Sequence, residues 1–296
     1  MNSSTATTVF LPIALGVIML GLGLSLTVAD FGRVLRYPRA AAVALGCQIL
    51  VLPALCLGLV LLFDLQPTLA VGMMLLAASP GGTTANLFSH LAGGDVALNV
   101  TLTAVNSVLA VITLPVVVNL AIDGFLDGGD AIGLQPDKLV QVFAIVLVPV
   151  ALGMLLRNRA PALAERLNRP VKIASVVVLV SVIAVAVYQE RDNVLDYVRA
   201  VGLVALLLCV ASLAVGYLVP RAFAVPRGQA VASSFEIGVH NSTLAITIAL
   251  SPALLDSPEM AVPPAVYGIL SFVPAGLLAY ALSRRDDDRA LSRPGR

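Results

Sequence analysis

Apolar residues fill long stretches of this chain, and polar residues gather in short segments between them. Nine stretches have about the 20-residue length with which an α-helix crosses a bilayer. They cover residues 8–28, 39–62, 69–91, 96–121, 139–156, 171–188, 200–219, 229–250 and 262–282. The longest connections, near 123–137 and 157–170, leave no room for a soluble domain. The pattern predicts an all-α polytopic membrane protein, with nine transmembrane helices in one domain over residues 1–296.

Composition agrees with this class. Hydrophobic residues make up 59% of the chain and charged residues 12%, against about a quarter charged in an ordinary globular domain. The net charge of +1 gives no reason to expect a nucleic-acid partner. The three cysteines lie in apolar stretches without metal-ligand spacing, so we interpret them as small core residues.

Basic residues predict the orientation, because they favour the cytoplasmic side of a membrane. Only Lys138, Arg191 and Arg199 fall in one set of alternate loops. The other fifteen fall in the opposite set: Arg33, Arg36, Arg39, Arg157, Arg159, Arg166, Arg169, Lys172, Arg221, Arg227, Arg284, Arg285, Arg289, Arg293 and Arg296. We therefore expect a cytoplasmic tail at 283–296 and an outside N-terminus. The segment before the first stretch has no basic residue, so we expect that stretch to be retained rather than cleaved as a signal peptide. Arginine outnumbers lysine sixteen to two, which suggests a GC-rich bacterial genome and hence a bacterial inner membrane.

The third apolar stretch is interrupted by SPGGTTAN, from Ser79 to Asn86. Eight helical residues, Val71 to Ala78, rise about 12 Å, so the break lies near the middle of the bilayer. Pro80 lacks a backbone donor, and Gly81 and Gly82 are poor helix formers. Irregular backbone at this depth persists only where protein, ions or water satisfy it.

The eighth stretch, AVASSFEIGVHNSTLAITIAL, carries a matching polar centre with the acid Glu236. A charge in mid-membrane costs about 2.5–3.5 kcal/mol on insertion scales, so such residues face a bundle interior, a cavity or a cation. Two interrupted helices in corresponding halves of a chain indicate the ion and substrate site of a transporter. The alternative is that the small polar residues only pack helices together.

A polar stripe follows in the fourth stretch. Asn99, Thr103, Asn106 and Ser107 share one helical face. Amide and hydroxyl oxygens suit alkali cations, but they also make interhelical hydrogen bonds, the role we favour for Asn106 and Ser107. Gln48, in the second stretch, would by itself be interpreted as a packing amide.

These segments together resemble the bile acid:sodium symporter family. The resemblance is carried by GLGLSLTVADF (Gly21–Phe31), SPGGTTANLFSHLAGGDVALNVTLTAVNSVL (Ser79–Leu109) and FEIGVHNSTLA (Phe235–Ala245). It implies an inverted-repeat transporter fold with a panel, a core and two broken helices, about 69–91 and 229–250, that cross in the core. Bacterial members have ten helices, and the resemblance implies that this chain starts at the second.

The resemblance also implies two sodium sites that share Glu236. The first would use the Ala85 carbonyl and the side chains of Asn86, Asn99, Thr103 and Glu236. The second would use Gln48, Glu236, the carbonyls of Ile237 and Val239, and His240, where the family has a glutamine. The family often has serine where this chain has Ala85 and Asn99. Substrate would bind near Thr83 and Asn241, beside the N-termini of half-helices.

The expected function is therefore sodium-coupled symport of an organic anion, bile-acid-like or a small carboxylate, by alternating access. Its partners would be one or two sodium ions, the anion and the bilayer, with no organic cofactor. One alternative is proton coupling in the same fold, through Glu236 or His240. Another is a membrane receptor that binds ligand without transporting it. An enzyme is not expected, because no nucleophile motif such as G-x-S-x-G and no metal-ligand set occurs.

Overall fold

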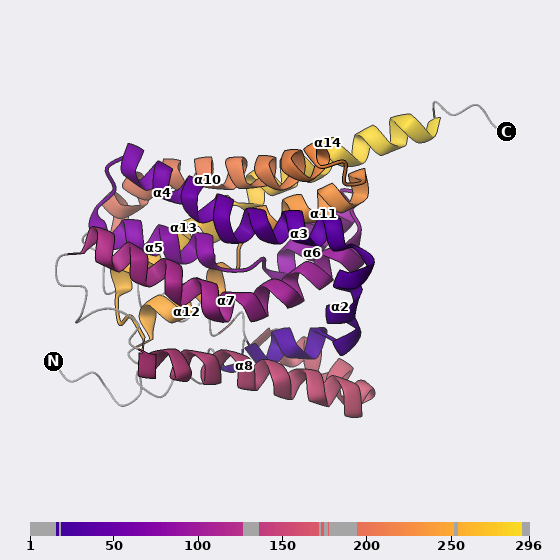
Figure 1. The fold of residues 1–296 in the computed structure, drawn as a ribbon, viewed down its shortest axis with the longest axis horizontal. Coiled ribbons are helices and arrows are strands. Elements are labelled where there is room, and N and C mark those ends of the chain that lie inside the picture. Colours follow the sequence, from indigo (N-terminus) through magenta and orange to yellow (C-terminus); the bar gives the residue numbers. More distant parts are fainter. Residues whose placement is uncertain are drawn as a thin grey trace.

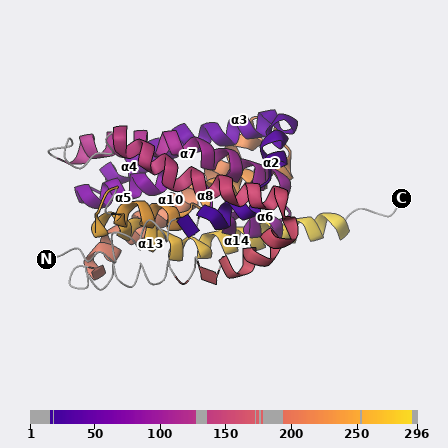
Figure 2. The same ribbon diagram turned by 90° about the horizontal axis from the view of Figure 1, so that it is seen from below.

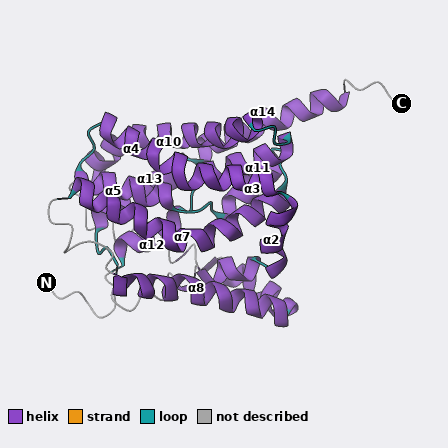
Figure 3. Ribbon diagram, viewed as in Figure 1, coloured by secondary structure: helices purple, strands orange, loops and turns teal. Residues whose placement is uncertain are grey.

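The computed structural model describes residues 16–126 apart from 18, 136–174 apart from 172, residue 177, 194–251 and 254–291. Side chains are described over the same ranges except at Thr83, 136–146, Val194 and 285–291. Within these ranges the chain is helical without any β-strand (Figure 3). In chain order the helices are α2 (Val28–Gly32), α3 (Pro38–Gly46), α4 (Leu52–Leu62), α5 (Pro67–Ala78), α6 (Thr83–Leu91), α7 (Val96–Phe125), α8 (Pro136–Arg159), α10 (Val194–Ala222), α11 (Arg227–Gly238), α12 (Ser242–Leu250), α13 (Pro258–Leu270) and α14 (Phe272–Leu291).

Four of the described helical segments are long and apolar enough to span a bilayer: Pro38–Leu62, Val96–Phe125, Leu195–Ala222 and Pro258–Arg284. The first joins α3 to α4 through a π-helical turn, η2 (Cys47–Val51). Together with the helical content, these segments show a helical membrane protein, as the hydropathy pattern predicted. The predicted stretch at 171–188 lies almost entirely outside the described residues.

Two helix pairs are separated by short non-helical segments. Residues 79–82 lie between α5 and α6, and residues 239–241 lie between α11 and α12. None of these four helices exceeds twelve residues, so none reaches across a bilayer alone. Both interruptions fall in the middle of their predicted stretches, where the proline, glycines and polar residues occur.

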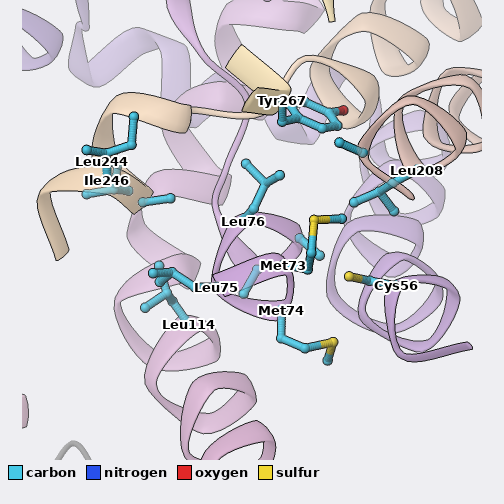
Figure 4. Close-up of a cluster of buried hydrophobic side chains, with 14 of the residues drawn as sticks. Cys56, Met73, Met74, Leu75, Leu76, Leu114, Leu208, Leu244, Ile246 and Tyr267 are labelled. Carbon is cyan, nitrogen blue, oxygen red and sulfur yellow. The ribbon is translucent and has the colours of Figure 1, made fainter. Parts of the chain in front are cut away.

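The core is built around α5, whose residues from Leu69 to Ala78 are all buried. A helix that is apolar on every face belongs in an interior, and α5 packs there against α4, α7 and α13. The apolar cluster around Met73 and Leu76 surrounds it (Figure 4). A side chain on Gly72 would collide with the Met260 carbonyl, so α5 and α13 touch backbone to backbone. This packing holds the end of α5 in place at the first interruption.

Helix α8 and the helical residues 19–25 form a layer at one side of the other helices (Figures 1 and 2). Their backbones meet at Gly23 and Gly153, where an added Cβ would clash with main-chain atoms of the opposite helix. Arg157 also donates a hydrogen bond from Nη1 to the Leu24 carbonyl, at 3.3 Å. The two segments therefore pack as a unit.

Three boundaries predicted from the apolar stretches are wrong. Helix α7 continues through Asp123 to Phe125, residues 161–171 are helical where a loop was expected, and α14 continues to Leu291 within the tail. Charged residues mark where a helix leaves the apolar layer, but they do not end it, because a helix can continue into the aqueous phase and Arg, Lys and Glu are good helix formers. The ends of hydrophobic stretches are therefore poor guides to the ends of helices.

Candidate cation site at the helix crossover

The two interruptions pair with each other through their backbones. The Gly82 amide donates to the Val239 carbonyl at 2.9 Å, and the Asn241 amide donates to the Pro80 carbonyl at 2.8 Å. Gly81 and His240 thereby form an isolated antiparallel bridge. Backbone groups released by one break thus satisfy groups released by the other, as irregular backbone inside a membrane protein requires.

Glu236, in the last turn of α11, lies at this crossover and is 2% exposed. Its Oε2 accepts a hydrogen bond from Thr103 Oγ1 at 2.5 Å, and its Oε1 accepts one from the Gly81 amide at 3.2 Å. The side-chain ion pairs recorded among the described residues, Arg33–Asp30 and Arg199–Asp196, do not involve it. Two hydrogen bonds without a countercharge leave a buried carboxylate poorly compensated, so this position suits a bound cation or a proton.

Two amide oxygens nearby in the fold also lack partners. Asn86 Oδ1, on α6, and Asn99 Oδ1, on α7, are buried and accept no hydrogen bond. The Asn99 amide is oriented by its own Nδ2, which donates to the Ala232 carbonyl of α11 at 2.7 Å. Buried acceptors are almost always satisfied, and an unpaired one is costly. Helices α6, α7 and α11 pack on one another, so these oxygens belong to the same helix junction as Glu236.

The available donor set is one of hard oxygens. It comprises the Glu236 carboxylate, the two asparagine carbonyls and the Thr103 hydroxyl, while Ala85 is buried in the first turn of α6. Within the part of the chain that the structure describes, no group of three or more His, Cys, Asp or Glu residues is placed to hold a metal ion. Neutral oxygens with a single carboxylate suit a monovalent cation of low charge better than a transition metal.

Gln48 and His240 meet at another atom, the Ser79 carbonyl at the end of α5. Gln48 Nε2 donates to the Ala77 and Ser79 carbonyls, both at 3.1 Å, and His240 Nδ1 lies 3.2 Å from the Ser79 carbonyl. Because a carbonyl only accepts, Nδ1 must carry the proton, and in the neutral ring Nε2 is then an acceptor. That Nε2 and Gln48 Oε1 are both buried without a hydrogen-bond partner. The two unpaired acceptors fit a second cation position.

Gln48 reaches the end of α5 from the π-helical turn η2, which is a local irregularity of a kind often found at functional sites. The residue pattern by itself indicated only a packing amide at Gln48, and its place in the second sodium site was implied by the family resemblance. Sequence reasoning also missed Ser79, whose backbone orients both side chains, and Tyr267 of α13, whose hydroxyl reaches the crossover. The only sequence signal for Tyr267 was that it is a lone tyrosine in an apolar stretch.

The implied substrate residues, Thr83 and Asn241, lie at the two interruptions. Asn241 caps α12, accepting from the Leu244 amide at Oδ1. It lines a cleft with Pro80 and Ser107, and the other wall consists of apolar residues of the first helix and α8, including Leu22 and Val150. Thr83 is the first residue of α6, and its side chain lies outside the described part.

The implied backbone ligands of the second sodium position, the carbonyls of Ile237 and Val239, flank the break between α11 and α12. The Val239 carbonyl already accepts a hydrogen bond from the Gly82 amide.

Comparison with known proteins identifies the family of this chain. The profile of the sodium bile acid symporter family matches residues 12–197. An uncharacterized sodium-dependent transporter of Bacillus subtilis, YocS, is 26% identical over 93% of this chain and 84% of its own. A probable chloroplastic sodium/metabolite cotransporter of Arabidopsis thaliana, BASS1, is 29% identical over 93% of this chain and 68% of its own. The human ileal sodium/bile acid cotransporter is 25% identical, over 80% and 68% respectively.

These relatives are sodium-dependent transporters and not enzymes. The predicted resemblance is confirmed, since the profile covers more than half of the chain. The chain belongs to the sodium bile acid symporter family.

Proposed function

We propose that this protein is a sodium-coupled symporter that carries an organic anion across the membrane by alternating access. The observation that carries the proposal is the buried Glu236, which lies without a recorded countercharge at the helix crossover. Buried and unpaired acceptors on Asn86 and Asn99 lie at the same helix junction. A sodium ion would satisfy all three groups at once.

The first sodium position would be formed by the Ala85 carbonyl and the side chains of Asn86, Asn99, Thr103 and Glu236. The second would be formed by Gln48, Glu236, His240 and the carbonyls of Ile237 and Val239. Support for the second comes from the free acceptors Gln48 Oε1 and His240 Nε2. Support for Ile237 comes from the Asn241 amide, which donates to Pro80 instead of the Ile237 carbonyl four residues earlier. No organic cofactor is required by this scheme.

The anion would bind in the cleft at Thr83 and Asn241, near the N-termini of α6 and α12. Those ends carry partial positive charge, which favours a carboxylate. The facing wall is apolar, so the rest of the substrate would be a hydrocarbon body, as in a bile-acid-like molecule or a small carboxylate.

The cleft also suggests what moves. We propose a single transmembrane domain over residues 1–296, with nine membrane-crossing segments arranged as inverted repeats. The layer of residues 19–25 and α8 would act as part of a panel, and the crossing broken helices would belong to a core. Because the cleft lies between these groups, a shift of one against the other would open it to either side.

Stoichiometry determines the driving force. Two sodium ions with a monoanion move one net positive charge, which gains about 2.3 kcal/mol per 100 mV of membrane potential. One sodium with a monoanion is electroneutral, and the sodium gradient alone would drive it.

A thermal-shift screen of organic anions, with sodium or with choline, tests this function. Ligands that bind only the folded state raise the unfolding temperature. An anion that binds together with sodium should therefore stabilise the protein more in sodium than in choline. A labelled hit should then accumulate in proteoliposomes under an inward sodium gradient. Accumulation under a proton gradient without sodium would favour the proton-coupled alternative, and binding without accumulation would favour a receptor.

We predict that the C-terminal tail and the 157–172 segment face the cytoplasm and that the N-terminus and the 63–67 connection face outward, in a bacterial cell membrane. Gln66→Cys and Glu165→Cys place single thiols at exposed positions on opposite ends, while Cys47, Cys56 and Cys209 are buried. A membrane-impermeant maleimide added to intact cells should label Gln66→Cys only. Labelling of Glu165→Cys alone would reverse the orientation.

His240 is expected to make sodium binding depend on pH. A protonated imidazole would present an N–H at Nε2 in place of a lone pair and would repel a cation. We therefore expect acidification to raise the sodium concentration for half-maximal uptake, and His240→Gln to flatten that dependence while keeping sodium-stimulated uptake. Glu236 and Tyr267 are unchanged in this variant, so a loss of pH dependence would be due to His240. A pH profile of sodium-stimulated uptake identical to that of wild type would restrict His240 to packing.

A further inference from the structure

The break between α11 and α12 releases backbone carbonyls that a continuous helix would have bonded. In an α-helix each carbonyl accepts from the amide four residues later. Here the Ser242 amide, which would serve the Gly238 carbonyl, donates to the His240 carbonyl at 3.0 Å. The Gly238 carbonyl therefore needs a partner from another element, because it is buried between helices.

Tyr267 supplies that partner from α13. Its hydroxyl donates to the Gly238 carbonyl at 2.8 Å, and the Cys209 thiol of α10 lies 3.7 Å from the same oxygen. Tyr267 is fully buried and borders the apolar cluster around Leu76 (Figure 4). Its ring also lies 5.3 Å from the ring of His240.

Consecutive carbonyls of the break are thus held by different parts of the molecule. Gly238 is held by Tyr267, and Val239 is held by the Gly82 amide from the other interruption. Gly238 also lies directly against Leu213 of α10, with no room for a side chain. These contacts fix the orientation of the peptide units between Glu236 and His240.

We infer that Tyr267 is a positioning residue for the cation site, which its hydroxyl preorganises by fixing the Gly238 carbonyl. This inference rests on the proposed sodium coupling. Tyr267 does not touch the candidate ligand atoms of Glu236, but it sets the backbone that carries them. Without the hydroxyl, the Gly238 carbonyl keeps only the longer contact from the Cys209 thiol. The Gly238 peptide would then be held less firmly, and sodium binding would have to order it.

The alternative is that Tyr267 only packs in the hydrophobic core. Both roles would lower the stability of a variant, so stability alone does not separate them. A preorganising role changes the sodium dependence, because the reordering cost falls on cation binding. A packing role lowers the unfolding temperature equally with and without sodium.

The test is Tyr267→Phe, which removes the hydroxyl and keeps the ring against His240. Sodium titrations of thermal stability and of anion uptake would be compared with wild type. The matched control is Tyr197→Phe, which likewise removes only a hydroxyl. The Tyr197 hydroxyl donates to Glu259 Oε1 at 3.4 Å, away from the crossover. The net free energy that one hydrogen bond contributes corresponds to about a 3- to 10-fold change in an equilibrium constant.

We expect Tyr267→Phe to raise the sodium concentration for half-maximal stabilisation and uptake by about 3- to 10-fold. The maximal uptake rate at saturating sodium should stay close to wild type, and Tyr197→Phe should leave the sodium dependence unchanged. An unchanged half-saturation in Tyr267→Phe, with a lower unfolding temperature in sodium and choline alike, would overturn the inference and leave the sodium coupling intact. A wild-type protein that did not respond to sodium would instead overturn the proposed function, and the inference with it.

Discussion

Glu236→Gln should abolish sodium-dependent stabilisation and transport while the protein stays folded. The amide keeps the shape of the carboxylate and an oxygen for the Gly81 amide or the Thr103 hydroxyl, but it carries no charge. At an effective dielectric constant of about 20, opposite unit charges 4 Å apart attract by about 4 kcal/mol. Each 1.4 kcal/mol is about tenfold in affinity, so sodium binding should weaken on the order of a thousandfold.

The measurement is the unfolding temperature in sodium and in choline, together with uptake at matched expression. The unfolding temperature of Glu236→Gln in choline should equal or exceed that of wild type, since a buried charge has been removed. Asn86→Ala is the graded comparison and should weaken sodium binding far less, because it removes one neutral ligand among several. Sodium stabilisation of Glu236→Gln equal to that of wild type would remove this carboxylate from the mechanism.

Gly81→Ala should be nearly as damaging, although it adds only a methyl group. A Cβ at Gly81 would lie within 2.5 Å of both carboxylate oxygens of Glu236, closer than real contacts allow. The backbone of Gly81 does not have a positive φ, so the damage would come from this collision alone. The carboxylate would have to leave its position, and the bond from the Gly81 amide would be lost with it.

The neighbouring glycine provides a matched control. A Cβ at Gly82 would meet its nearest atoms, the His240 carbonyl oxygen and Thr84 Oγ1, at 3.5 Å, which is ordinary contact. Gly82→Ala should therefore retain sodium-stimulated uptake, while Gly81→Ala loses most of it. Equal effects of the two substitutions would mean that the motif needs glycine for backbone freedom and not for the approach of Glu236.

Much of the site could be predicted from the sequence because its signals are local. Pro80 with two glycines disrupts a helix wherever it occurs, and an acid such as Glu236 stands out in an apolar stretch. The stripe containing Asn99 and Thr103 follows from helical periodicity alone. The structure adds that Thr103 and Gly81 both bond the same carboxylate.

The remaining features depend on contacts between distant segments. Gly81 and Glu236 are 155 residues apart, and Gln48 meets His240 only because both donate to the carbonyl of Ser79. Hydrophobic patterns specify which face of a helix is buried, but not which helix covers it. Tyr267 was missed for the same reason. Its hydroxyl donates to the Gly238 carbonyl, which lacks a helical partner only because the helix is interrupted between α11 and α12.

Equilibrium binding of radioactive sodium to the purified protein tests most directly whether the crossover is a sodium site. Wild type should bind sodium saturably, with one or two ions per chain, and unlabelled sodium should displace the label while potassium in equal excess should not. Glu236→Gln and Gly81→Ala should bind none above background, and Gly82→Ala should bind as wild type does. Saturable sodium binding of equal affinity in wild type and Glu236→Gln would contradict a sodium site at the crossover.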